Sequence, residues 1–316
     1  MNKAIKILSI IGGSLLLVGF VLAVLSFSIL GFDYRKLNAS EPSEKKIEHF
    51  SANSIQTIKT DFNDKKIIVR PTDNKDITLT YYQSKREPFT INQDGDTLSL
   101  ANSIQNNEFN QIRFGIFFGV SQISSADVII DVPSNYSGNF YLDTSNGSVE
   151  IANLSQAKAI DVHNSNGSIA LRNLKCTTLK ARSSNSSISI ENVVATDSII
   201  ANSSNGKLKL TQVTANSVNL RTSNASIELI NTTATTKMSA ESSNGKISID
   251  KVISNDIYLK SSNGSIKGTI NGKQEEYFIK SDTSNSSSNL PNNWGKGPKK
   301  LEVETSNASI NVEFVD

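Results

Sequence analysis

The sequence predicts an all-β protein, a β-solenoid with about 19–22 residues per coil that follows one N-terminal transmembrane helix. Nine Ser-Asn pairs recur through the second half of the chain, and their asparagines are separated by 20, 19, 20, 19, 20, 19, 22 and 22 residues. Such a fixed period is typical of a repeat architecture. Apolar and polar residues alternate on both sides of each pair, which indicates strands. A long uncharged apolar segment near the N-terminus indicates the helix.

The N-terminal segment predicts a membrane anchor. No charged residue occurs from Ile7 to Phe32, and this length can cross a hydrocarbon layer of about 30 Å as a helix. Lys3 and Lys6 precede it, so we expect residues 1–6 to be cytoplasmic, residues 7–32 to span the cell membrane, and the rest of the chain to be extracytoplasmic. A cleaved signal peptide is the alternative, although its apolar region would be unusually long.

Residues 33–46 predict a polar linker, and residues 47–133 predict an irregular β region that caps the solenoid. A degenerate repeat is expected around Asn63, and Gly95 between two aspartates predicts a hairpin turn. The candidate strands are Ile55–Thr60, Lys66–Arg70, Ile77–Tyr82, Pro88–Asn92, Thr97–Ala101 and Asp127–Val132.

Residues 134–316 predict the repeats, with an insertion near residues 272–300. Apolar residues stand six and four positions before most repeat asparagines and three and five positions after them, so each repeat predicts two short strands around a polar turn. Asn and Gly tolerate the positive φ of a sharp turn. A parallel solenoid fits the identical turns, with a longer polar loop opposite that absorbs the one-residue length variation; an antiparallel meander is the alternative.

The repeat asparagines predict a structural ladder. In a solenoid they stack at a buried corner, where each amide can hydrogen-bond the next. A row that binds glycan or ions is the alternative. The nine positions are Asn146, Asn166, Asn185, Asn205, Asn224, Asn244, Asn263, Asn285 and Asn307.

Composition favours a non-catalytic protein without a cofactor or metal. Lys plus Arg (32) nearly balances Asp plus Glu (30), so nothing predicts nucleic-acid binding. The chain has one cysteine, Cys176, and an exported domain without disulfides suits a Gram-positive envelope. Only His49 and His163 are histidines, and no zinc, nucleotide-binding or nucleophile motif is present.

A polysaccharide lyase or hydrolase on a β-helix is the enzymatic alternative, and it requires acidic residues gathered on one face. The outward column three positions before each repeat asparagine has mixed signs. Asp143 and His163 would be neighbours in it, which we interpret as an incidental surface pair. Asp282 and Glu304 are its one acidic pair.

Aromatic residues concentrate near the two ends of the predicted solenoid and are the candidate partner-binding residues. The densest run, Arg113–Val120, contains Phe114, Phe117 and Phe118, and the C-terminal insertion contains Trp294. The phenylalanine run predicts either a plug for the first coil or an apolar loop that touches the membrane or a membrane partner.

The membrane helix, the Asp-Val-Pro strand that ends at Pro133 and the Ser-Asn-Gly-x-Ile-x-Ile units together resemble a bacterial "putative adhesin" family of β-strand-repeat envelope proteins of unknown function. The resemblance covers about residues 50–316. It implies a solenoid-like fold, no catalytic residues, and for some members a connection with envelope stress in Gram-positive bacteria. We therefore expect a membrane-anchored binding or scaffold protein whose partner is a cell-wall polymer or an envelope protein, with a purely structural stalk as a further alternative.

Overall fold

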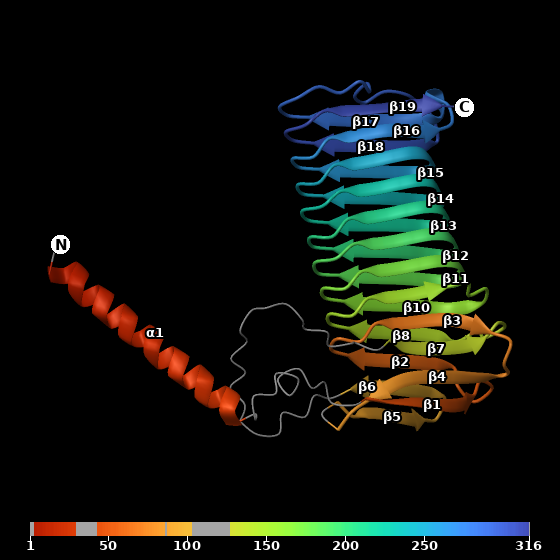
Figure 1. Ribbon diagram of the computed structural model, residues 1–316. Helices are drawn as coiled ribbons and strands as arrows, with labels where there is room; N and C mark the ends of the chain where they lie inside the picture. The colour runs from red at the N-terminus through yellow and green to blue at the C-terminus, as the bar shows by residue number, and fades with distance from the viewer. Residues whose placement is uncertain (1–2, 30–42, 86, 103–126, 316) are drawn as a thin grey trace. The chain divides into compact units, whose positions relative to one another are not determined.

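The computed structural model describes residues 3–29, 43–85, 87–102 and 127–315. It divides into two compact units, Met1–Pro42 and Ser43–Asp316, which we describe separately (Figure 1). The described residues of the first unit form one helix, α1 (Lys3–Ile29). Its segment Lys6–Leu25 is long and apolar enough to cross a membrane, and none of that segment is buried against protein. The helix begins four residues before the expected start, and residues 30–32 lie outside the described part.

In its described residues the second unit is built from strands and one 3₁₀ turn. The six strands predicted between residues 55 and 132 each match an observed strand to within two residues at either end. The elements are β1 (Glu44–Ser51), β2 (Thr57–Phe62), β3 (Ile67–Thr72), β4 (Asp76–Gln83), β5 (Phe89–Asp94), β6 (Thr97–Asn102), β7 (Val128–Pro133), β8 (Asn139–Thr144), β9 (Val149–Ala152), β10 (Ala157–Asn164), β11 (Ile169–Ser183), β12 (Ile188–Ser203), β13 (Leu208–Thr222), β14 (Ile227–Ser242), β15 (Ile247–Ser261), β16 (Ile266–Asn271), η2 (Gln274–Glu276), β17 (Tyr277–Thr283), β18 (Lys299–Thr305) and β19 (Ile310–Val315).

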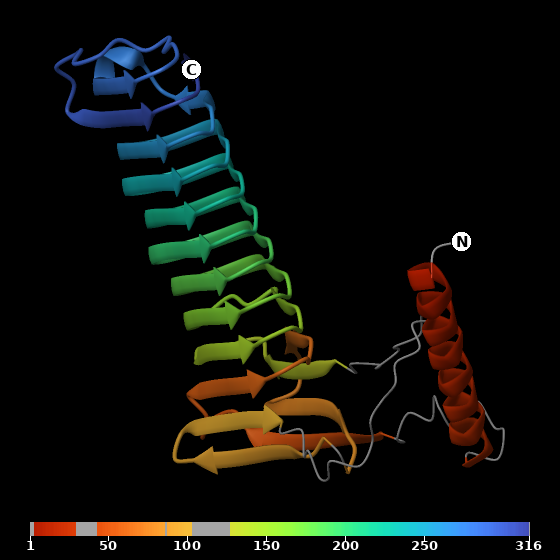
Figure 2. The same ribbon diagram turned by 90° about the vertical axis from the view of Figure 1, so that its left-hand side faces the viewer.

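The repeat strands pair in parallel, so the solenoid prediction is confirmed and the meander is wrong. Each Ser-Asn turn joins two parallel ladders. The ladder before the turns runs β5-β6-β2-β8-β10-β11-β12-β13-β14-β15-β18-β17, and β5 alone is antiparallel in it. The ladder after the turns runs β1-β4-β7-β3-β9-β11-β12-β13-β14-β15-β16-β19, with antiparallel pairs only at β1–β4 and β4–β7. Strands β11 to β15 belong to both ladders because each of them continues into the next coil (Figure 2).

Each regular coil, formed by β11 to β15, has three short segments, where the sequence predicted two. In β11 the alternation of buried and exposed residues resets at Asn173, which has φ of 54°, and the register with β12 shifts between Cys176 and Thr178. Between these points Leu174 and Cys176 point inward as a third side. The expected polar loop is therefore a continuous strand with a bulge, and that bulge absorbs the length variation. The third side escaped the prediction because its second inward residue is small, for example Ala195 in the next coil.

The coil order in space differs from the chain order at both ends. The β6–β7 coil lies outside the β2–β3 coil, while β8 and β9 return to stack on its other face. At the C-terminus β18 and β19 stack directly on β15 and β16, and β17 pairs outside β18. The final coil therefore lies between its two predecessors, which hydrophobic periodicity cannot reveal.

The expected linker is too long by three residues, because β1 begins at Glu44. All eight residues of β1 pair with β4. Its partly buried positions hold Lys46, Glu48 and Phe50, while Ile47 faces solvent, so charged residues at inward positions conceal this edge strand.

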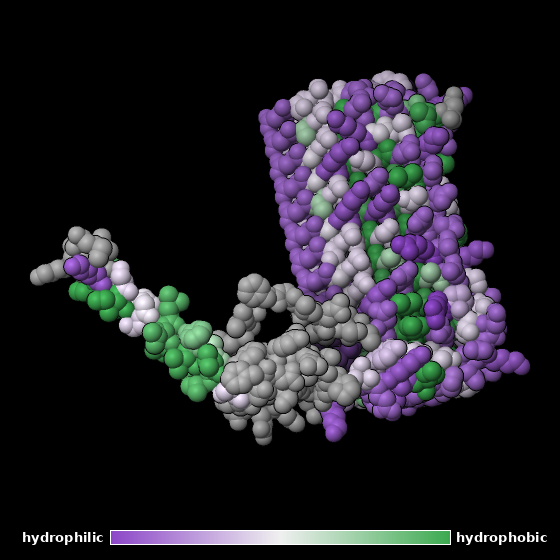
Figure 3. Space-filling model, in the orientation of Figure 1, coloured by the Kyte–Doolittle hydropathy of each residue, from purple (hydrophilic) through white to green (hydrophobic). Residues whose placement is uncertain are grey.

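Inward apolar columns form one continuous core, and burying each Ile or Leu stabilises the fold by about 1.5–3 kcal/mol. In the view of Figure 3 the edge where the Ser-Asn turns lie is a continuous hydrophilic band, and hydrophobic residues reach the visible surface of the solenoid in patches between polar ones. This face of the solenoid is therefore mainly polar, and a candidate site has to be found among individual side chains.

Candidate functional site

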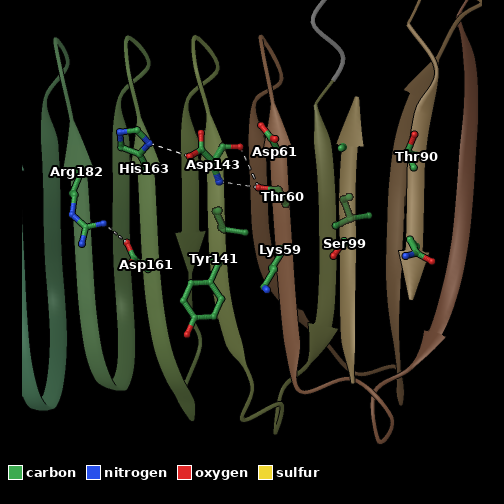
Figure 4. A pocket seen from close by; sticks show the side chains of 14 residues that line it. Lys59, Thr60, Asp61, Thr90, Ser99, Tyr141, Asp143, Asp161, His163 and Arg182 are labelled. Carbon is green, nitrogen blue, oxygen red and sulfur yellow. Dashed lines mark hydrogen bonds and ion pairs between the residues drawn. The ribbon is translucent and has the colours of Figure 1, made fainter. Parts of the chain in front are cut away.

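A pocket of ≈ 640 Å³ lies on the outer surface of the first ladder, near its N-terminal end (Figure 4). Strands β2, β5, β6, β8, β10 and β11 supply its side chains. Because successive residues of a strand point to opposite faces, residues one position away from the core column project into this pocket. The pocket is thus part of the outer face of the coils.

Tyr141 is the aromatic centre of the pocket. It lies in register with Lys59 of β2 on one side and with Asp161 of β10 on the other. Tyr141 is 43% exposed and is one of the few large hydrophobic residues exposed on the described part of the solenoid. Tyr141 was not among the predicted site residues, because it stands where the regular repeats meet the irregular N-terminal region and no repeat pattern marks it.

The next row of the pocket is ionic. Asp61, Asp143, His163 and Arg182 lie in register on consecutive strands. His163 Nδ1 lies 3.0 Å from Asp143 Oδ2, and Arg182 Nη1 donates to Asp161 Oδ1 at 3.0 Å. Both members of the His163–Asp143 pair are about half exposed. This arrangement places cationic hydrogen-bond donors and anionic acceptors around one aromatic ring.

The same pocket bears on the enzymatic alternative. Asp61, Asp143 and Asp161 share it with His163, so three carboxylates gather where the outward column had suggested mixed signs. Asp61 was missed because it belongs to the degenerate first repeat. Two of the three already bind a basic side chain, and in the described residues no group of three or more His, Cys, Asp or Glu could hold a metal ion. At the other end, Glu304 lies between Lys260 and Asp282 in register, and Lys280 also binds it.

The repeat asparagines form a hydrogen-bonded row along the Ser-Asn edge. Each donates its Nδ2 to the Oδ1 of the neighbour on the N-terminal side, over 2.7–2.8 Å in every Asn-Asn pair. Asn307 precedes Asn285 in this row, as the coil order requires. All nine asparagines are exposed, so the expectation of a buried corner is wrong. The row ends at Asp64, whose carboxylate accepts from Asn146 at 2.5 Å. Asp64, and not Asn63, therefore occupies the repeat position of the first coil.

A second polar column, inside the corner, was not predicted. The residue two positions before each repeat asparagine is Ser, Thr or Asn, and it points inward. In the coil of Asn244, Ser242 Oγ accepts from the Gly245 amide at 2.9 Å and donates to the Ala225 carbonyl of the preceding coil at 3.1 Å. Its side chain is 6% exposed. The buried members of this column are Thr144, Asn164, Ser183, Ser203, Thr222, Ser242, Ser261 and Thr305.

The structure locates one of the predicted partner-binding aromatics. Trp294 lies in the C-terminal segment between β17 and β18, where its backbone exchanges hydrogen bonds of 2.7 and 3.0 Å with Ile279 at the outer edge of β17. The Trp294 side chain is 38% exposed. Phe114, Phe117 and Phe118 lie outside the described residues. The strands that flank this segment are described: β6 ends at Asn102 in the first ladder, and β7 begins at Val128 in the second.

A second pocket of ≈ 570 Å³ lies among the turns beside β1, β3 and β7. Tyr136 lines it, and burial raises the pKa of its hydroxyl, which has no hydrogen-bond partner in the described part of the chain. Lys75 and Lys158 also line this pocket, but Lys75 is flanked by Asp73 and Asp76 in the same turn. Its charge is mixed, as in the Tyr141 pocket, but Tyr136 is buried whereas Tyr141 is exposed, so the Tyr141 pocket is the better candidate.

Comparison with known proteins gives a family match over most of the chain. A protein-family profile described as Toastrack DUF4097 matches residues 55–313. No curated protein gives a significant match. A solved "putative adhesin" from Bacteroides fragilis NCTC 9343 is 15% identical, covers 87% of this chain and 100% of its own, and has a TM-score of 0.37. A solved "putative cell adhesion protein" from Clostridium sporogenes ATCC 15579 is 11% identical with the same coverages and a TM-score of 0.19. Neither score is high enough to support a functional comparison.

Proposed function

This chain belongs to the Toastrack DUF4097 family, and from that premise we propose that it is a membrane-anchored extracytoplasmic protein that binds a component of the bacterial cell envelope without catalysis. The observation that carries the proposal is the Tyr141 pocket, an open surface site with an exposed aromatic ring and half-exposed ionic pairs around it. Such a site is accessible to a large ligand, as adhesion to a wall polymer or an envelope protein requires.

Anchoring is supported by α1, which contains an uncharged apolar segment behind Lys3 and Lys6. With this charge distribution the N-terminus stays cytoplasmic and the solenoid lies outside the cell membrane. An exported domain with a single cysteine suits the envelope of a Gram-positive bacterium. The test uses the full chain with a C-terminal tag in intact cells. External protease should remove the tag, and N-terminal sequencing of the membrane fraction should recover the intact α1. Recovery of a chain that begins after residue 29 would identify a cleaved signal sequence and refute the anchor.

Binding is tested with the full chain in nanodiscs, mixed with purified insoluble cell walls. We expect the wild-type protein to sediment with the walls. We also expect crosslinking in cells to recover an envelope component that is the same with and without wall stress. If the wild-type protein neither binds walls nor crosslinks to any envelope component, the proposed function is refuted and a structural stalk is favoured.

A second candidate function is polysaccharide cleavage, which the gathering of Asp61, Asp143 and Asp161 beside His163 favours. Paired carboxylates are the usual machinery of glycoside hydrolysis. The same wall preparation distinguishes the two functions, because an enzyme releases soluble oligosaccharides with time and Asp61→Asn or Asp143→Asn abolishes the release. A binding protein releases none.

A further inference from the structure

We infer that the Tyr141 pocket recognises an uncharged glycan, with a sugar ring stacked on Tyr141; this rests on the proposed function and names its ligand class. The ring projects from the outer face of β8 between Lys59 and Asp161 (Figure 4). The C–H groups of a pyranose face carry partial positive charge and fit the negative face of an aromatic ring. An exposed tyrosine on a flat strand surface offers such a platform.

The flanking side chains match the rim of a sugar ring. A pyranose presents hydroxyl groups around its edge, and each hydroxyl both donates and accepts. Lys59 on one side of Tyr141 is a donor, and Asp161 on the other side is an acceptor that Arg182 holds in place. A stacked ring could therefore bond to both flanks at once.

The charge of the pocket selects against anionic polymers. Lys59 and Arg182 are cationic, whereas Asp61, Asp143 and Asp161 are anionic. Asp61 forms no ion pair or hydrogen bond with another described side chain, and it lies directly opposite Asp143 in register. Two adjacent carboxylates repel phosphate and sulfate groups, so a phosphate-rich wall polymer or an anionic lipid is a poor ligand for this surface.

The chain supplies a matched control. Tyr258 occupies the same repeat position as Tyr141, five residues before a repeat asparagine, on the same outer ladder. Its register neighbours are Ser239 and Glu302, so it lacks the Lys59 flank and the pocket. Both tyrosines project outward, and their substitution should leave the melting temperature unchanged.

The test measures binding of the N-acetylglucosamine hexamer to the full chain in nanodiscs by calorimetry. We expect Tyr141→Ala to weaken binding by at least about tenfold, as for loss of an aromatic hot spot, and Tyr141→Phe and Tyr258→Ala to stay within about twofold of wild type. Dextran sulfate should not compete. Because Trp294 is the one tryptophan and lies at the other end of the solenoid, its fluorescence should not respond.

Several outcomes would overturn the inference. Equal binding by wild type and Tyr141→Ala, preferential binding of dextran sulfate, or wall binding without hexamer binding would each exclude an uncharged sugar on Tyr141. In these cases wall sedimentation of the wild-type protein would persist, and the proposed function would stand. If the wild-type protein neither sediments with walls nor crosslinks to any envelope component, both the inference and the proposed function would be refuted.

Discussion

Removing one buried hydroxyl should destabilise the solenoid more than removing one member of the prominent asparagine row. The comparison can be made within a single coil. Ser242→Ala removes the hydroxyl that joins the Gly245 amide to the Ala225 carbonyl of the preceding coil. Asn244→Ala removes a side chain that donates to Asn224 at 2.8 Å and accepts from Asn263 at 2.7 Å.

The expected magnitudes follow from burial. After Ser242→Ala the Gly245 amide belongs to a buried residue and has lost its acceptor, which costs about 1–3 kcal/mol. The Ala225 carbonyl is half-buried, and water can replace part of its bond. After Asn244→Ala both remaining partners are exposed amides that water can solvate, so the cost should stay below about 1 kcal/mol.

The assay is native-state hydrogen exchange, because repeat proteins can unfold in parts and a single unfolding free energy then loses its meaning. Ser242→Ala should accelerate exchange of the Gly245 amide and of neighbouring coils, and it should lower the melting temperature more than Asn244→Ala does. Equal effects, or a larger effect of Asn244→Ala, would refute the reasoning that the second polar column, inside the corner, joins the coils there.

Three further predictions follow from the same structure. Deleting residues 299–316 removes β18 and β19 and with them the parallel partner of β17, so limited proteolysis should digest β16 and β17 while β11 to β14 stay protected. Nine amides donate toward Asp64, so its carboxylate faces the positive end of an aligned row, and Asp64→Ala should destabilise by about 0.3–1 kcal/mol at low salt and by less in 1 M salt, as at a helix N-terminus. Burial raises the pKa of the Cys176 thiol to about 12, so the folded protein should not react with a thiol reagent at pH 8, whereas the denatured protein should react stoichiometrically. Since this pKa is raised, its contribution to stability is complete below the ordinary thiol pKa near 9 and declines as the pH rises toward 12, which unfolding midpoints can follow.

The sequence was most informative where one residue period repeats many times. Alternation around Asn205 or Asn244 reports which side chains face the core, and identical turns indicate parallel stacking. It was also informative at Gly95, whose φ of 58° forms the predicted hairpin between β5 and β6. The second polar column could have been recognised as well. Alternation places a Ser, Thr or Asn among otherwise apolar inward positions, and a buried polar side chain needs partners.

Other features leave no local signal in the sequence. Backbone hydrogen bonds between parallel strands are the same whichever coil supplies the partner, so the pattern cannot place β18 between β15 and β17. The Tyr141 pocket could not be predicted for the same reason, because Asp61 and Asp143 can be recognised as neighbours only from the coil order. The partner-binding assignments of Phe114 and Trp294 stay predictions.

The interleaved coil order at both ends makes the number of coils between them adjustable. An extra copy of an interior repeat, such as residues 205–223, has only to match the register of two like neighbours. A copy added at either end would have to reproduce a connection that passes over an occupied coil. The distance between the Tyr141 surface and the Trp294 end can therefore change in steps of about 4.8 Å per repeat while both ends stay intact. The solenoid therefore has two ends of fixed structure and a middle part whose length can vary.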